Sequence, residues 1–481
     1  MAVQDWQMVI GIETHVQLAT RAKMFSSAPA AWCEQPNLQA NELDFGMPGT
    51  LPVANQAAVD MAVRFGLAVD ARIATVSEFA RKHYFYPDLP KGYQISQFEH
   101  PIINGGLITV ADDDDQFAVR LVRAHLEEDA GKLTHDMRPG KSLADYNRAG
   151  LPLLEIVSEP DLRSARQAAA YGRTLHKLVR WLQICDGNMQ EGSLRFDVNV
   201  SLRHNESDPL GTRCEIKNLN SFRFVEQAIE NEAARQAQLL EAGESIIQQT
   251  RLFDTTSGQT RAMRSKEDAQ DYRYFPDPDL LPLRIDEQTI EKIRRGMPEL
   301  PDACRQRYID QYGLSPYDAG VLSAERGLAT YFDEVARQCP DAKLAANWVA
   351  GDLLALCNSA GTTPAKAPVT AAMLAGLLSR IADQTVSGKM GKEILAKMWQ
   401  SQKPADEIIE GEGLSQISDA GQLQEVLATI IEKNPKQVQQ YQAGKHKLLG
   451  FFVGQAMKET GGQANPQQLN ELAKRMLDEQ K

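Results

Sequence analysis

Hydrophobic and polar residues alternate in several short segments of the first half of the chain, which is the pattern of a strand with one buried face. In residues 8–18 (MVIGIETHVQL) the apolar side chains fall on one parity, and Glu13 and His15 fall on the other. Residues 193–203 (SLRFDVNVSLR) repeat the pattern with Asp197 on the polar parity. An antiparallel strand with one face in water explains either segment alone.

Carboxylates also occur in the other segments that resemble strands. Glu127 and Glu128 follow FAVRLVRAHL, Glu155 follows the apolar run of AGLPLLEIV, and Glu215 and Lys217 alternate around an isoleucine. A solvated surface would more usually mix lysine and glutamate with threonine and glutamine. A strand face that carries carboxylates together with Arg, Asn, His and Lys side chains favours the binding of divalent cations and of the phosphates that these cations carry.

Such crowding predicts that the site depends on a metal ion, because like charges on one face repel each other unless cations are bound. Magnesium held by a few carboxylates supplies the charge neutralisation that phosphoryl transfer needs, and strands hold ligands more rigidly than loops do. His15 is either a ligand or a hydrogen-bonded histidine on the polar face, and the pattern leaves both readings open.

A second candidate cluster lies in residues 81–97 (RKHYFYPDLPKGYQISQ), where Lys82 and Lys91 bracket aromatic residues and prolines. The turn-rich YPDLPKGY would hold a lysine in a fixed pose near a phosphate or a carboxylate. A structured surface loop with solvated lysines is the alternative.

The pattern changes along the chain. Residues before about Leu283 are rich in short β-like runs and turn signals, and the Pro-rich stretch Tyr272 to Leu283 is expected to be extended. The pattern is helical after Arg294, with Ser315 as the expected N-cap of one helix. Residues Pro404 to Gly413 resemble a linker, and the remainder is again helical.

Composition restricts the class of protein. The chain has 481 residues, 43% of them hydrophobic, and a net charge of −12, which indicates two to four domains and argues against nonspecific nucleic-acid binding. We find no signal segment and no apolar run long enough for a membrane span. The six cysteines form no close pair, so they indicate free thiols in a reducing compartment; Cys185 and Cys214 border apolar runs and are expected in the core.

One local basic segment stands against the overall acidity. No acidic residue occurs between Lys433 and Lys458, and Tyr441 and His446 are interleaved with the lysines. Contacts between lysines and phosphates would give salt-dependent affinity for a nucleic acid, although a solvated helix pair remains the alternative. The candidate phosphate-binding residues are Lys433, Lys436, Lys445, Lys447 and Lys458. The apolar stretch LLGFFVGQAM is expected to form the core of this last part.

Taken together, the motifs resemble the GatB family, the B subunit of the glutamyl/aspartyl-tRNA(Gln/Asn) amidotransferase, over nearly the whole chain. The motifs occur in this order: GIETHVQL, FGMPGTLPVAN, KHYFYPDLPKGYQISQ, HLEEDAGK, DYNRAGLPLLEIVSEPD, DGNMQEGSLRFDVNVSLR, EIKNLNSFRFVEQAIENE, DYRYFPDPDLLPL and HKLLGFFVGQAMKETGGQANP.

The resemblance implies an activity and an assembly. Members of the family use ATP to phosphorylate the side-chain carboxylate of Glu or Asp misacylated onto tRNA. Ammonia from an amidase-type (glutaminase) subunit then displaces the phosphate, giving Gln-tRNA and Asn-tRNA in a cytoplasmic heterotrimer that includes a small third subunit. The activity is that of a ligase that forms a carbon–nitrogen bond with glutamine as amido donor.

The resemblance also implies a fold and site residues. The expected fold class is α+β: a cradle-shaped catalytic domain with a largely antiparallel sheet, related to glutamine synthetase (1–294), an all-α helical domain (295–407) and a small all-α tail that binds tRNA (408–481). Carried over to this sequence, the magnesium residues are Glu13, His15, Glu128, Glu155 and Asp197. Lys82 and Lys91 are expected at the nucleotide or the transferred phosphate, and Glu13 and Glu128 with both lysines are the expected catalytic groups.

The sequence departs from many relatives in one place. Where they carry two cysteine pairs that bind zinc, this chain has only Cys33, so we expect no zinc and a segment held by packing around Trp32 and Phe45.

Two other functions stay open at this stage. The chain lacks a Lys-Ser-Ser amidase signature, so it is expected to need a partner that makes ammonia. It could instead be a tRNA-binding scaffold with an inactive ATP site, or a self-contained ligase that uses free ammonia. Crowded carboxylates argue against a pure scaffold, which has no use for like charges on one sheet face.

Overall fold

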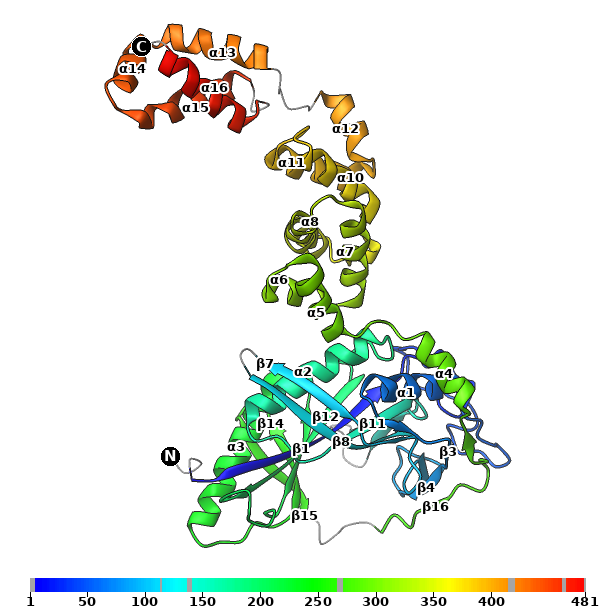
Figure 1. Cartoon of the computed structure of the whole chain (residues 1–481). Helices are drawn as coiled ribbons and strands as arrows, with labels where there is room; N and C mark the ends of the chain where they lie inside the picture. The colour runs from blue at the N-terminus through cyan, green and yellow to red at the C-terminus, as the bar shows by residue number, and fades with distance from the viewer. Residues whose placement is uncertain are drawn as a thin grey trace. The chain divides into compact units, whose positions relative to one another are not determined.

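The computed structural model describes residues 5–112, 115–135, 141–265, 271–413, 420–460 and 464–479. The chain divides into two compact units, Met1–Leu300 and Pro301–Lys481 (Figure 1). The first unit combines a large sheet with helices, and the second is helical. The fold is therefore α+β.

A ten-stranded mixed sheet organises the described part of the first unit. Its strands are β1 (Gln7–Gln17), β2 (Arg72–Ile73), β6 (Ile103–Asn104), β7 (Leu107–Asp112), β8 (Asp115–Glu128), β11 (Pro152–Ser158), β12 (Leu194–Arg203), β13 (Cys214–Leu219), β14 (Gln249–Asp254) and β15 (Gln259–Ser265). Their order is β15-β14-β13-β12-β1-β11-β8-β6-β2, with β7 paired to β8. Of these pairings, β13 with β14 is parallel and the others are antiparallel.

Helices cover one face of this sheet. They are α1 (Gln56–Ala68), α2 (Ala165–Trp181), α3 (Phe222–Glu241) and α4 (Glu287–Arg295). Ile10, Ile12 and Val16 of β1 are buried in the core that these helices share with the sheet. Because successive side chains of a strand point to opposite faces, Glu13 and His15 lie on the face that the helices leave open.

Short strands lie outside the large sheet. Three of them, β4 (Ala80–His83), β5 (Tyr93–Ser96) and β16 (Phe275–Pro276), form a small sheet of their own. Two further pairs are β3 (Val76–Ser77) with β17 (Leu283–Arg284), and β9 (Lys132–His135) with β10 (Ser142–Asp145). In Figure 1, β4 and β16 lie to the lower right of the large sheet, whereas α1 and α2 lie above it. Lys82 of β4 and Gln94 of β5 line a cavity together with His15 and Glu127, so the small sheet borders the open face.

The segment that precedes α1 is held by a buried ion pair as well as by packing, and only one of the two aromatic residues predicted to pack does so. The prediction that it packs around Trp32 is wrong, because the Trp32 side chain is 72% exposed. Phe45 does pack, edge to face against Tyr146 with ring centroids 5.5 Å apart. The centre of the segment is a fully buried ion pair, in which Lys23 Nζ lies 3.1 Å from Asp44 Oδ2. The sequence pattern favoured the large aromatic residue and gave no sign of a buried charge pair.

The second unit begins with a run of helices. They are α5 (Pro301–Tyr312), α6 (Pro316–Leu322), α7 (Arg326–Gln338), α8 (Ala342–Trp348), the π-helical turn η2 (Val349–Leu353), α9 (Leu354–Ser359), the 3₁₀ turn η3 (Pro364–Lys366), α10 (Ala371–Ala382), α11 (Gly388–Ser401) and α12 (Ala405–Glu412). Ser315 caps α6 as predicted, since its side chain accepts a hydrogen bond of 3.1 Å from the Asp318 amide.

The prediction of a linker over Pro404 to Gly413 is wrong, because this stretch contains α12. Ala405, Ile408 and Ile409 recur at helical spacing and are buried. Gly413 ends the helix in the left-handed conformation with φ of +64°. Asp406 and Glu407 occupy the first turn of α12, where acidic side chains are favourable.

The last helices have a hydrophobic core of their own. They are α13 (Ala420–Lys433), α14 (Pro435–Gln442), the 3₁₀ turn η4 (His446–Leu448), α15 (Leu449–Glu459) and α16 (Pro466–Glu479). Phe452 and Ala456 of α15 are fully buried in this core, which confirms the role predicted for LLGFFVGQAM. Nowhere in the ranges that the structure describes is a helix both long and apolar enough to cross a bilayer.

Candidate metal and nucleotide site

Strand register brings a row of polar side chains together on the open face. His15 of β1 pairs in register with Glu155 of β11 on one side and with Arg195 of β12 on the other. Glu155 in turn lies opposite His125 of β8. Because residues in register share a face, these four side chains form one row across four strands.

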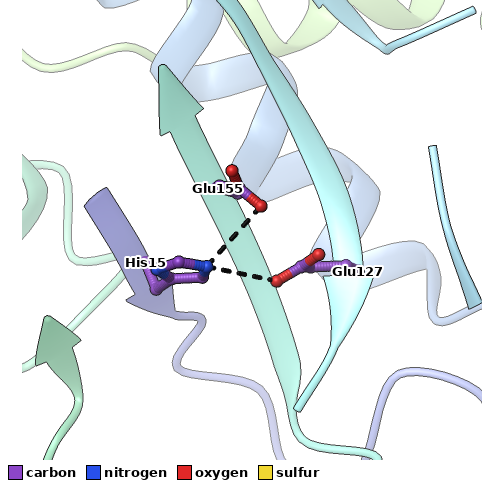
Figure 2. A group of neighbouring side chains, drawn as sticks. All are labelled: His15, Glu127 and Glu155. Atoms are coloured by element: carbon purple, nitrogen blue, oxygen red, sulfur yellow. Dashed lines mark ion pairs between the residues drawn. The ribbon is translucent and has the colours of Figure 1, made fainter. Parts of the chain in front are cut away.

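A compact group of three possible metal ligands, His15, Glu127 and Glu155, lies at this row (Figure 2). Each residue offers a donor atom, and the three atoms lie within 4.8 Å of one another. His15 Nε2 is 3.5 Å from an oxygen of each glutamate. Two carboxylates and an imidazole, on three rigid strands, fit a divalent cation such as magnesium.

His125 adds a fourth side chain to this group. Its Nε2 lies 3.3 Å from Glu155 Oε2 and 3.8 Å from Glu127 Oε2, and its side chain is buried. Burial alone would lower the pKa of His125, but Glu155 and Glu127 outweigh it and raise the pKa to about 9. For Glu155, burial alone would raise the pKa, but His125 and His15 hold it well below its usual range.

The charge balance of the group also fits a cation. Burial lowers the pKa of His15, but hydrogen bonding and attraction to Glu155, and attraction to Glu127, raise it to about 8. The raised pKa values reflect how strongly the two carboxylates attract positive charge. A divalent cation would supply that charge in place of a proton on His15, because only a neutral imidazole ligates a metal.

A second acidic group lies further along the same face. Glu13 and Asp197 pair in register on β1 and β12. Lys217 of β13 bridges Asp197 and Glu215, with distances of 2.6 and 2.9 Å. Burial, followed by the charges of Glu155, Glu215 and Asp197, raises the pKa of Glu13. The structure thus brings the predicted residues Glu13 and Asp197 together, next to the His15 group and with a lysine that sequence reasoning did not assign.

Lys82 reaches the same place from the small sheet. It lines a cavity of about 210 Å³ together with His15, Glu127 and Glu155. Its ammonium lies 4.9 Å from the ring centre of Tyr272. Burial lowers the pKa of Lys82, but the charge of Glu127, then those of Tyr274 and Glu155, raise it above its ordinary value. Lys82 therefore carries a positive charge opposite the carboxylates.

Lys91 and Glu128 are not part of this group. The Lys91 ammonium forms a close ion pair with Glu128, whose carboxylate also accepts a hydrogen bond of 2.9 Å from the Ile95 amide. Glu128 follows Glu127 directly, so its side chain points to the other face of β8. The structure joins the two predicted residues to each other and places Glu128 outside the cluster of three ligands.

Glu127 and His125 lie in this cluster but were not among the residues predicted for the site, although a signal was present. In VRAHLEE, His125 and Glu127 share one parity, whereas Leu126 and Glu128 share the other. The parity rule that selected Glu13 and His15 would have selected Glu127 rather than Glu128.

Other predicted residues lie elsewhere. Cys185 and Cys214 are buried as predicted, and burial raises the pKa of their thiols to about 12 and about 11, which makes them poor nucleophiles. The five lysines predicted to contact phosphate are all exposed on the tail helices or beside them: Lys433, Lys436, Lys445, Lys447 and Lys458.

Comparison with known families agrees with this architecture. The model of the GatB/GatE catalytic domain matches residues 8–291, which span the sheet and both acidic groups. A second model, the GatB domain, matches residues 330–477. The chain belongs to the GatB family.

Curated members of the GatB family match along their whole length. The B subunit of the aspartyl/glutamyl-tRNA(Asn/Gln) amidotransferase from Alkalilimnicola ehrlichii is 55% identical over 476 residues, which is 98% of this chain and 100% of the relative. Proteins of the same name from Thioalkalivibrio sulfidiphilus and Nitrosococcus oceani are 54% identical over 475 residues, again with 98% of this chain and 100% of each relative.

Proposed function

We propose that this chain is the ATP-dependent subunit of a tRNA-dependent amidotransferase. It phosphorylates the side-chain carboxylate of Glu-tRNA(Gln), Asp-tRNA(Asn) or both, and the acyl phosphate is then amidated by ammonia. The products are Gln-tRNA(Gln) and Asn-tRNA(Asn). The observation that carries the proposal is the group of His15, Glu127 and Glu155, which faces Lys82 across one cavity.

Each residue has a role in this proposal. His15, Glu127 and Glu155 would hold magnesium, and Glu13 and Asp197 would hold a further ion or position the first. Bound magnesium would neutralise the phosphate oxygens of ATP. Lys82 would bind the transferred phosphoryl group from the opposite wall, where its charge opposes the charge that develops during transfer.

Lys91 and Glu128 would act through each other. Glu128 ends β8 one residue after Glu127, and its bonds to Lys91 and to the Ile95 amide tie that end to β5. β5 pairs with β4, which carries Lys82. The ion pair of Lys91 and Glu128 would therefore fix the distance between Lys82 and the carboxylates of the cavity.

The wider assembly follows the family. A partner with amidase (glutaminase) activity would release ammonia from glutamine, and a small third subunit would complete a cytoplasmic heterotrimer. Residues 1–294 would form a cradle-shaped catalytic domain related to glutamine synthetase, residues 295–407 a helical domain, and residues 408–481 a tail that binds tRNA. No zinc is required in this scheme.

The tail lysines give a testable prediction. Replacing Lys445 and Lys447 with glutamine is expected to weaken tRNA binding, because both side chains are exposed and would contact phosphates. The slope of log K against log salt should fall by about 0.9 for each phosphate that the protein no longer neutralises. Filter binding across a salt series measures both quantities.

The same substitution of Lys366 and Lys403, which are exposed outside the tail, serves as the control and should leave the slope unchanged. Deletion of residues 408–481 without any loss of tRNA affinity or salt slope would refute the role of the tail.

Reconstitution of the complete enzyme tests the proposed function. The complex would receive each misacylated tRNA, ATP, magnesium, and glutamine or ammonium, with one component omitted at a time. The proposal is supported if ADP forms only when the misacylated tRNA is present. It is also supported if the amide forms only when ADP forms. ATP turnover that survives replacement of Glu155 would favour a scaffold, and amidation of a small free acid without tRNA would favour a self-contained ligase.

A further inference from the structure

A row of aromatic side chains leads away from the cavity that contains the proposed magnesium site. Tyr272 lines this cavity together with Lys82. The Tyr272 ring meets the ring of Tyr274 edge to face, with centroids 6.1 Å apart. Tyr274 in turn stacks on Phe98, with centroids 4.2 Å apart and the two planes within 6° of each other. The three rings therefore form one continuous row that starts at the wall of the cavity.

A second, smaller pocket lies at the other end of this row. It has a volume of about 120 Å³, and its lining includes the rings of Phe98, Tyr274 and Phe275; we call it the aromatic hollow. Phe98 and Phe275 are 41% and 42% exposed. Large apolar side chains that are exposed next to one another mark a binding site more often than scattered ones do. The bases of a single-stranded nucleic acid are flat and stack on such rings.

The strands of the small sheet connect the cavity with the aromatic hollow. On β4, Lys82 lines the cavity and Ala80 lines the hollow. Residues two apart on a strand share a face and lie about 7 Å apart. On β5, Gln94 lines the cavity, whereas Phe98, two residues beyond the end of the strand, lines the hollow. A separation of about 7 Å matches the rise of two stacked nucleotides, at about 3.4 Å each.

The turn that carries the two tyrosines is fixed in place. His83 Nδ1 lies 3.1 Å from the carbonyl oxygens of both Tyr272 and Arg273, and the His83 amide donates a hydrogen bond of 3.0 Å to the Tyr272 carbonyl. These bonds hold Arg273 in the left-handed conformation with φ of +44°, which is uncommon for a residue other than glycine. Backbone strain of this kind clusters at sites that bind ligands.

This turn also presents a positive charge next to the rings. The Arg273 side chain is 80% exposed, and its Nε lies 3.4 Å from a carboxylate oxygen of Asp271, which is 78% exposed. Ion pairs that are this exposed contribute little stability. A phosphate outside the aromatic hollow can therefore replace Asp271 as the partner of Arg273.

Two carboxylates restrict what the aromatic hollow can hold. Glu78 and Glu99 belong to its lining, and their charge disfavours a phosphate inside it. Carboxylates do accept hydrogen bonds from the exocyclic amino groups of cytosine and adenine. Every tRNA ends in the sequence CCA, and its amino acid is esterified to the ribose of the last adenosine. The lining of the hollow therefore suits the bases at the end of a tRNA.

We propose that the aromatic row binds the unpaired 3′ end of the aminoacyl-tRNA. The terminal adenosine lies against Tyr272 at the edge of the cavity, and the cytosine before it lies in the aromatic hollow beside Phe98 and Tyr274. The inference rests on the proposed function, because a side-chain carboxylate that is phosphorylated in the cavity is only a few bonds from the terminal ribose. It deepens that function by assigning residues that position the substrate.

A second cavity on the open face is the main alternative for the tRNA end. It has a volume of about 260 Å³, and its lining includes Glu13, Glu159 and Arg213. Among the described residues that line it, none carries an aromatic ring, and the two glutamates repel phosphates. The aromatic row is therefore the better place for unpaired bases.

Shortening the tRNA tests the proposal without requiring catalysis. The reconstituted complex is titrated by filter binding, at one salt concentration, with uncharged tRNA that carries or lacks its last two nucleotides. The wild-type complex is expected to bind the shortened tRNA about tenfold or more weakly, because it loses base stacking. Phe98→Ala should lose most of this difference: it should bind intact tRNA more weakly than the wild type, and shortened tRNA equally well.

Two further variants serve as controls. Phe98→Tyr keeps an aromatic ring and should retain the wild-type difference between intact and shortened tRNA. Tyr317→Ala removes a ring that is 77% exposed on α6, outside the aromatic hollow, and should also retain that difference. Equal melting temperatures, and a complex that keeps its partner subunits in size-exclusion chromatography, show that each variant is intact.

Photolabelling locates the tRNA end independently. The probe is tRNA with 8-azidoadenosine as its last nucleotide, and the labelled peptides are mapped by mass spectrometry with excess unlabelled tRNA as competitor. Labels that the competitor suppresses are expected on the peptides that contain Phe98 or Tyr272 to Tyr274. Suppressible labels confined to the peptide that contains Leu210 to Arg213 would place the end in the alternative cavity and overturn the inference.

The remaining outcomes also decide the matter. The inference fails if the wild-type complex binds both tRNAs equally, or if shortening costs Phe98→Ala as much as it costs the wild type. It also fails if Phe98→Ala releases a partner subunit, because the row is then a protein contact. The proposed function is tested separately by ADP release in Glu155→Gln. If that rate is unchanged while Phe98 and the tRNA end are coupled, the proposed function fails and the binding site for the tRNA end stands.

Discussion

Glu155→Gln is expected to slow the ATP-dependent step by about 10²–10³-fold, equivalent to several kcal/mol of lost electrostatic stabilisation. Glu155 lies between His15 and His125, and both imidazoles hold its pKa well below the usual range. Glutamine keeps the shape of the side chain and removes its charge. The variant should therefore fold normally and bind magnesium weakly.

The measurement is ADP release by the reconstituted complex with ammonium as the nitrogen source. Glutaminase activity in the same complex should be unchanged, because it belongs to the partner protein in the proposed function. Glu244→Gln, an exposed glutamate between α3 and β14, is the matched control and should keep wild-type rates. If Glu155→Gln releases ADP at the wild-type rate, the Glu155 carboxylate has no role in the ATP-dependent step.

Lys23→Met is expected to destabilise the chain by about 3–5 kcal/mol, because it leaves the Asp44 carboxylate buried without its cation. The side chains of Lys23 and Asp44 are 0% and 1% exposed. Lys23 also donates a hydrogen bond of 3.2 Å to the Tyr146 carbonyl, so the substitution also weakens the attachment of the segment that follows β10. Urea unfolding, followed through the transition in which the unit Met1–Leu300 unfolds, measures the change in the free energy of unfolding.

Two further variants test this explanation. The double variant Lys23→Met with Asp44→Leu should recover much of the loss, because it removes both buried charges. Lys397→Met, which breaks the exposed ion pair with Glu412, should cost no more than about 1 kcal/mol. An equal loss at the exposed pair would show that burial is not the cause.

Local sequence patterns predicted much of the sheet and part of the site. The alternation around Glu13, His15 and Asp197 predicted β1 and β12 and the face on which these side chains lie. The helix cap at Ser315 was equally local, since one side chain and one backbone amide determine it. These features depend on neighbours within a few residues, which a single sequence displays.

Features set by distant contacts were not predictable from such patterns. Lys82 shares a cavity with Glu155 only because the fold brings β4 close to β11, and no periodicity of the sequence encodes that proximity. The burial of Lys23 depends on Asp44, 21 residues away, whereas hydrophobicity alone pointed to Trp32. Strand parity, by contrast, is local, and it would have placed Glu127 rather than Glu128 on the face of Glu13 and His15.

The most direct test of the central claim is a crystallographic one. Crystals of the complex soaked in Mn²⁺ and an ATP analogue, measured at the manganese absorption edge, locate the ion by its anomalous signal. We predict a peak bounded by His15 Nε2 and the carboxylates of Glu127 and Glu155, lost in Glu155→Gln. A fully occupied ion bound to the phosphates at any place away from these three side chains would contradict the account.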